Sequence, residues 1–155
     1  MNRDQIEAEA ITVDKAVKAA AQGGCVVGLN GLQPVLLAGP RQAWSTLFVL
    51  GSICIAELRK ANPGSPDREL VLRTDAWTTG GSAKIPLNIE TPRARQAAAE
   101  LVGNLLRSDL LATHLTYLKA VLTAPCRDCF TLQVSHVLLH AALTLADSDT
   151  DACGS

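Results

Sequence analysis

Two cysteines and two histidines in the last third of this 155-residue chain are the residues best suited to chemistry. Cys126 and Cys129 lie in the segment Cys-Arg-Asp-Cys, and His136 and His140 follow. By residue type these four side chains could ligate zinc. If the last helix begins at Cys129, however, His140 lies about 16 Å farther along it, at ~1.5 Å per residue. Zinc ligands must lie about 2.0–2.3 Å from one ion, so this site requires the helix to begin near Leu132.

The two histidines alone are spaced more favourably for a metal, because they lie four residues apart on one helical face. Such a pair still needs a third ligand from another element. The same face carries Gln133, Thr144 and Asp147, which is typical of the solvated side of a helix. The favoured interpretation is therefore two exposed histidines, with no cofactor.

The two cysteines alone could form a redox pair, because a helix N-terminus lowers the pKa of a thiol. In thioredoxin-type proteins such a motif belongs to a βαβ unit, whereas the leucine spacing of residues 109–123 predicts a helix before it. Asp128 also places negative charge beside the thiols. We therefore favour a tight turn between two helices, near the surface, with Cys126 and Cys129 as free thiols, and keep the redox role as an alternative.

The cysteine count bears on the compartment. The chain has five cysteines, and an odd number without a secretion signal argues against a disulfide framework. Cys25 and Cys54 lie in apolar runs and are expected to be inert core thiols. The segment MNRDQIEAEA has no apolar core of the kind that a signal peptide needs. We expect a cytoplasmic protein.

Composition excludes two further classes of partner. Fourteen basic and fifteen acidic residues give a net charge of -1, and no basic cluster is present that could neutralise a nucleic-acid backbone. The longest apolar stretch, residues 43–56, is shorter than the ~20 residues that span a bilayer. The loop from Thr78 to Lys84 (TTGGSAK) lacks the order of a phosphate-binding loop. Nucleic acid and membrane are not expected partners, and the small-molecule ligand is unknown.

Hydrophobic periodicity predicts an α+β fold with a small antiparallel sheet. Asn30-Gly31 between two apolar runs is a strong hairpin signal, and alternation over residues 68–78 and 84–89 predicts one or two more strands. A helix over residues 4–22 precedes the hairpin. A central apolar helix spans Pro40–Ala61, and three consecutive helices end the chain, starting near Thr91, Asp109 and Asp128.

We expect residues 1–155 to form one globular domain with a short, flexible acidic tail from about residue 147. No catalytic constellation is evident. The helix over residues 109–123 is rich in apolar side chains on two faces, which one small sheet cannot cover. The leading hypothesis is therefore a non-enzymatic binding or assembly module that self-associates through its helical half; the alternative is a metal- or thiol-dependent protein that uses the four residues above. The apolar residues of that helix are Leu110, Leu111, Leu115, Tyr117, Leu118 and Leu122.

Overall fold

The structure of the protein is a computed structural model, and residues 3–66 and 90–147 are described. These residues form six helices. They are α1 (Arg3–Gly23), α2 (Cys25–Leu36), α3 (Pro40–Ala61), α5 (Thr91–Leu106), α6 (Leu110–Thr123) and α7 (Arg127–Asp147). The described segments contain no strand.

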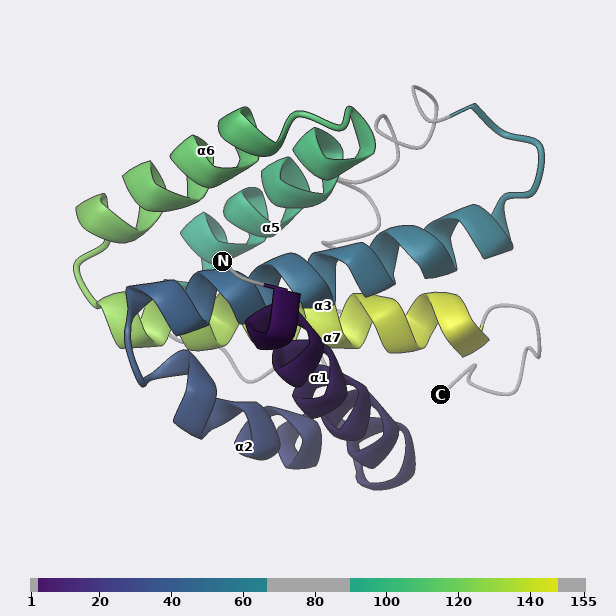
Figure 1. Ribbon diagram of the computed structural model, residues 1–155, viewed down its shortest axis with the longest axis horizontal. Coiled ribbons are helices and arrows are strands. Elements are labelled where there is room, and N and C mark those ends of the chain that lie inside the picture. Colours follow the sequence, from purple (N-terminus) through teal and green to yellow (C-terminus); the bar gives the residue numbers. More distant parts are fainter. Residues whose placement is uncertain (1–2, 67–89, 148–155) are drawn as a thin grey trace.

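Helices α3 and α7 lie side by side through the middle of the molecule, with the α1–α2 pair on one side and the α5–α6 pair on the other (Figure 1). Both central helices are apolar over most of their surface, so they are stable only where neighbours cover them on several sides. Their facing side chains make the centre of the core. Fully buried members include Leu47, Leu50, Phe130, Val134 and Leu138.

The predicted hairpin is wrong, and with it the α+β class. Asn30 and Gly31 lie in the middle of helix α2. Leu32 and Leu36, four residues apart, are buried against the core, and this helical spacing outweighs the local turn preference of Asn-Gly. The reversal of the chain occurs instead at Gly24, whose φ of 98° ends α1 and lets α2 fold back beside it.

Several predicted element boundaries are confirmed. Helix α3 spans Pro40–Ala61, as expected, and Asp109 caps α6 by accepting a hydrogen bond from the N–H of Ala112 over 3.0 Å. The strands expected at residues 68–78 and 84–89, the loop from Thr78 to Lys84 and the acidic tail lie outside the described residues.

Candidate functional site

Helix α6 lies at the outer edge of the molecule, packed mainly against α5. The side of α6 that faces the protein carries Thr113, Tyr117 and Val121, all buried and four residues apart. Such spacing forms one stripe along a helix. No other residue of α6 is buried.

A row of leucines runs along the exposed side of α6. Leu111, Leu115 and Leu122 are 70%, 55% and 65% exposed, and Leu118 between them is half-exposed. We call Leu111, Leu115, Leu118 and Leu122 the outer leucine seam. Isolated exposed leucines are ordinary, but a contiguous apolar row marks an interaction site.

The orientation of α6 is fixed by a cluster of rings. The Trp44 ring from α3 lies 4.9 Å from the ring of His114 and 5.4 Å from that of Tyr117, measured between centroids. Trp44 itself is buried. Because two side chains of α6 pack on one buried indole, the helix cannot rotate to hide its leucines without losing these ring contacts.

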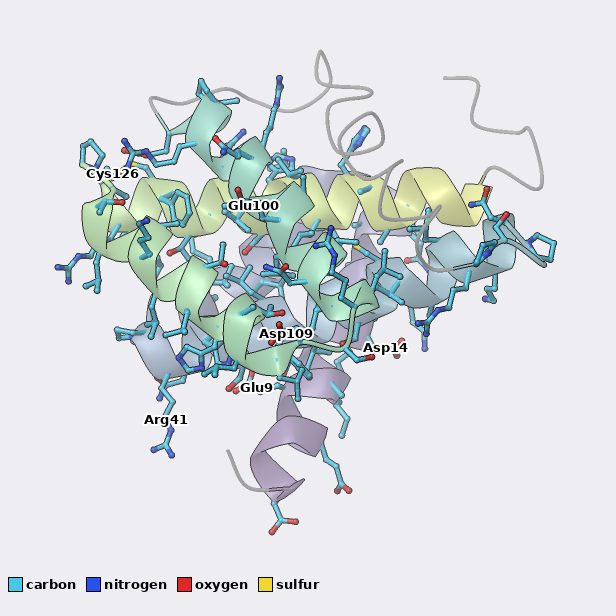
Figure 2. All side chains as sticks on the ribbon, turned by 90° about the horizontal axis from the view of Figure 1, so that it is seen from above. Glu9, Asp14, Arg41, Glu100, Asp109 and Cys126 are labelled. Atoms are coloured by element: carbon cyan, nitrogen blue, oxygen red, sulfur yellow. A yellow bond between two sulfur atoms is a disulfide. The ribbon has the colours of Figure 1, made fainter. Side chains whose placement is uncertain are left out.

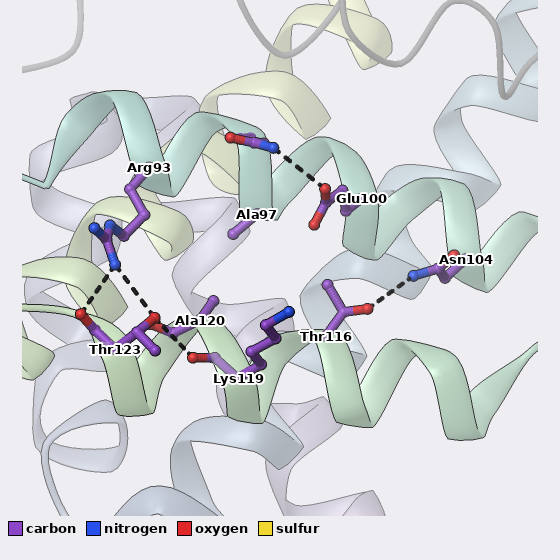
Figure 3. A pocket seen from close by; sticks show the side chains of 9 residues that line it. Arg93, Ala97, Glu100, Asn104, Thr116, Lys119, Ala120 and Thr123 are labelled. Carbon is purple, nitrogen blue, oxygen red and sulfur yellow. Dashed lines mark hydrogen bonds between the residues drawn. The ribbon is translucent and has the colours of Figure 1, made fainter.

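A groove of about 570 Å³, lined mostly by polar side chains, lies between α5 and α6 where they pack together (Figure 3). Hydrogen bonds cross the groove: Arg93 donates to the backbone carbonyl oxygen of Thr123 over 3.0 Å, and Asn104 donates to the hydroxyl of Thr116 over 3.5 Å. These bonds tie the two helices together. The groove therefore stabilises the position of α6.

Cys126 and Cys129 form a disulfide at the junction between α6 and α7. Figure 2 places Cys126 at one end of α6 and Asp109 at the other. The Cα atoms of the two cysteines lie 5.3 Å apart, within the range that a disulfide bridges. Cys126 lies in the turn between the two helices, as expected, whereas Cys129 lies in the first turn of α7; both residues are half-buried. The expectation of two free thiols is wrong, because the first helical turn brings residues three apart together.

Cys126 makes three hydrogen bonds. Its sulfur accepts a bond from the N–H of Cys129 over 3.2 Å. The carbonyl oxygen of Cys126 accepts a bond from the N–H of Phe130 over 2.9 Å. The N–H of Cys126 donates to Oε1 of Glu90 over 3.2 Å. Cys126 thus acts as the N-cap of α7.

Glu90 is the residue of this region that the sequence does not reveal. It is only 2% exposed, and its second oxygen lies 3.7 Å from Nε of Arg93. Glu90 and Cys126 are 36 residues apart, so no local sequence pattern connects them. The position of Glu90 directly before a helix predicts a helix cap and not a contact with the cysteines.

The structure does not bring the cysteines to the histidines. Helix α7 runs without a break from Arg127, not from Leu132, so His136 and His140 lie farther along its axis. No group of three or more metal-ligating side chains occurs among the described residues. The expectation of two exposed histidines is wrong: His136 is buried and His140 is half-buried, because α7 is a central helix and this side of it packs on its neighbours.

Burial has consequences for two titratable groups. Burial, and then the charge of His140, lowers the pKa of His136. Its Nε2 has no hydrogen-bond partner in the described segments. Burial also raises the pKa of the Cys54 thiol far above its usual range, and its sulfur donates to the carbonyl oxygen of Leu138. Cys54 is therefore an inert core thiol, as expected.

Comparison with models of protein families, with curated proteins and with solved structures finds no match to this chain. Across residues 3–66 and 90–147, no helix is both long and apolar enough to cross a membrane.

Proposed function

We propose that this protein is an assembly module that forms a homodimer through the outer leucine seam of α6. The observation that carries the proposal is the row of four leucines on the side of α6 turned away from its own core. Exposing this row to water costs free energy, at about 25 cal/mol per Å² of apolar surface. A partner that covers the row recovers that free energy.

The spacing of the seam favours a second copy of the chain as the partner. The leucines follow one another at steps of four, three and four residues, which is the repeat of a coiled-coil seam. This order reads the same in both directions. An antiparallel pair with a two-fold axis at the centre of the seam places Leu111 opposite Leu122 and Leu115 opposite Leu118 of the second copy, so one surface is complementary to itself.

The charges of α6 agree with such a pair. Its sequence contains a single charged side chain, Lys119, which lies beside the seam and does not interrupt it. Antiparallel helices also place the positive N-terminal end of one next to the negative C-terminal end of the other. Since the chain carries a net charge of only -1, repulsion between two copies is small.

Light scattering of the purified protein at tens of micromolar tests the proposal. We expect a mass of about twice 16.3 kDa, and a monomer in the Leu115→Glu variant, because a buried carboxylate on each side of the axis opposes association. The control is Ile11→Glu, which introduces the same charge at an exposed apolar residue of α1. A monomeric parent protein, or equal loss of the dimer in both variants, would contradict the proposal.

For the compartment we keep the cytoplasm as a proposal, based on the sequence. Localisation of a tagged full-length chain by cell fractionation tests it. Recovery of the protein in a membrane or secreted fraction would contradict this assignment.

A further inference from the structure

The disulfide between Cys126 and Cys129 is poorly placed for a structural role. The two residues lie three apart in sequence, and a cross-link that closes so short a loop restricts the unfolded chain least. The bond also joins the N-cap of α7 to the first turn of the same helix, so it does not tie separate helices together. Stabilising the fold is therefore not a sufficient role for this disulfide.

The surroundings of Cys126 stabilise a negatively charged sulfur. The N–H of Cys129 points to the Cys126 sulfur from 3.2 Å, and the partial positive charge of the α7 N-terminus acts at the same place. A thiolate at such a position is favoured over one in solution. Four charged side chains are nearby: Glu90 and Arg93 at the start of α5, and Arg127 and Asp128 between the cysteines. The Glu90 carboxylate, 3.2 Å from the Cys126 nitrogen, opposes the thiolate, and Arg93 at 3.7 Å offsets part of that charge. Arg127 and Asp128 are exposed and screened by water.

Two hydrogen bonds that do not depend on the disulfide hold the backbone of Cys126. The buried carboxylate of Glu90 holds the Cys126 N–H, and the bond from the Phe130 N–H holds its carbonyl. Neither bond involves a sulfur. We therefore expect the loop to keep its shape when the sulfur–sulfur bond opens and closes.

The cysteines are accessible to a partner. Both are half-buried, and the residues between them are exposed. A hollow of about 520 Å³ opens beside the motif. It is lined by Glu90, Pro92, Arg93, Gln96 and Pro125. Neither cysteine lines this hollow, but Pro125 precedes Cys126 in the chain and Glu90 accepts its N–H. A segment of another protein bound in the hollow therefore lies next to Cys126, whereas Cys54 is buried.

We propose that Cys126 and Cys129 are a redox-active pair that exchanges with disulfides of other proteins, with Cys126 as the attacking sulfur. In the reduced chain the Cys126 thiolate attacks one sulfur of the partner's disulfide. A mixed disulfide forms, and the other sulfur of the partner leaves as a thiolate.

The Cys129 thiol then loses its proton to water and attacks the Cys126 sulfur. The bond from Cys126 to the partner breaks, and the disulfide seen in the structure forms. In total the two cysteines lose two electrons and two protons, and the disulfide of the partner gains both as two thiols. This activity is independent of the proposed assembly, since the cysteines lie at the end of α6 and not in the outer leucine seam.

The two single variants, Cys129→Ser and Cys126→Ser, test which sulfur attacks. Each full-length variant is reduced, freed of reductant and mixed with oxidised glutathione at pH 6, and the trapped mixed disulfide is located by peptide mass mapping. We expect the Cys129→Ser variant to trap glutathione on Cys126 at least about tenfold faster than the Cys126→Ser variant traps it on Cys129. Cys54 is the internal control and stays unmodified in the folded chain.

Three outcomes would overturn the inference. They are equal trapping rates in the two variants, trapping on Cys126 no faster than on a free cysteine peptide, and retention of the disulfide when the parent protein meets excess reduced dithiothreitol without denaturant. Circular dichroism of each variant confirms that it is folded. The monomeric Leu115→Glu variant retains the exchange rate of the parent, so failure of the assembly and failure of the redox activity are distinguishable.

Discussion

Gly28 lets helix α2 lie directly on the backbone of α1 at Ala16. A Cβ atom at Gly28 would stand 2.6 Å from the carbonyl oxygen of Ala16 and 2.6 Å from the Cβ of Ala20. Real Cβ atoms do not approach a backbone oxygen so closely, and backbone cannot move aside as a flexible side chain does. The α1–α2 pair therefore depends on the absence of a side chain at this one position.

This contact predicts opposite effects for two glycines of the same helix. Gly28→Ala should lower the free energy of unfolding by about 1–3 kcal/mol, because the added methyl group forces α1 and α2 apart. Gly31→Ala should raise it by up to about 1 kcal/mol, because no atom lies within 4 Å of a Cβ there and alanine favours the helix. Urea titration of both variants measures the difference.

The sign of the Gly31→Ala effect also checks the correction to the fold. In a hairpin turn Gly31 would adopt a positive φ, and alanine at that position would destabilise the protein. A loss of stability in this variant would contradict a helical α2.

Local patterns predict five of the six described helices, but they miss α2 and do not give the arrangement of the helices. The proline at the start of α3 and the Asp109 cap of α6 act through their immediate neighbours, so the sequence alone predicts both ends. The segment around Asn30-Gly31 carries a turn signal and a helical repeat at once. The buried partners that decide between them, such as Ala20 in α1 and Leu139 in α7, come from helices that local patterns do not connect to it.

In the candidate site, too, local patterns predict some features and miss those that depend on contacts between distant helices. Residue type and spacing suffice to identify the cysteine pair and the leucines of α6. They do not reveal Glu90 beneath Cys126, because that contact joins two helix starts far apart in the chain. Nor do they show which face of α6 is outermost, because the choice depends on the packing of Tyr117 against Trp44.

The aromatic cluster predicts unequal effects for two large side chains of α3. Trp44 is buried beneath both ring residues of α6, whereas Phe48 is only half-buried and packs on the edge of the cluster. Trp44→Ala should cost about 3–5 kcal/mol of stability. Phe48→Ala should cost less, since part of its ring already contacts water. Denaturant titrations giving the reverse order would contradict this packing.

From the burial of His136 we predict that the protein loses stability in mild acid. Its pKa is lowered in the folded chain by burial and by His140, whereas an unfolded histidine has a pKa of about 6.5. Below that pH the unfolded state binds more protons than the folded state, so the free energy of unfolding falls as the pH decreases. His136→Gln should flatten this dependence between pH 7 and pH 5. An unchanged slope in the variant would assign the effect to other groups.

Removing the Asp109 side chain measures how much the N-cap contributes to the stability of α6. The helix has only 14 residues, too few for stability in isolation, and its outer leucines gain nothing within a single chain. Asp109→Ala should cost about 1 kcal/mol, because the Ala112 N–H loses its acceptor. Asp109→Asn should cost only a few tenths of a kcal/mol, since an amide oxygen caps nearly as well.

The control is Asp14→Ala, which removes an exposed ion pair with Lys18 and should change stability by less than about 0.5 kcal/mol. Thermal unfolding of the three variants at one protein concentration provides the comparison. If Asp109→Ala is no worse than Asp14→Ala, the cap does not hold α6, and the orientation of the outer leucine seam rests on the Trp44 contacts and on the packing and hydrogen bonds between α5 and α6.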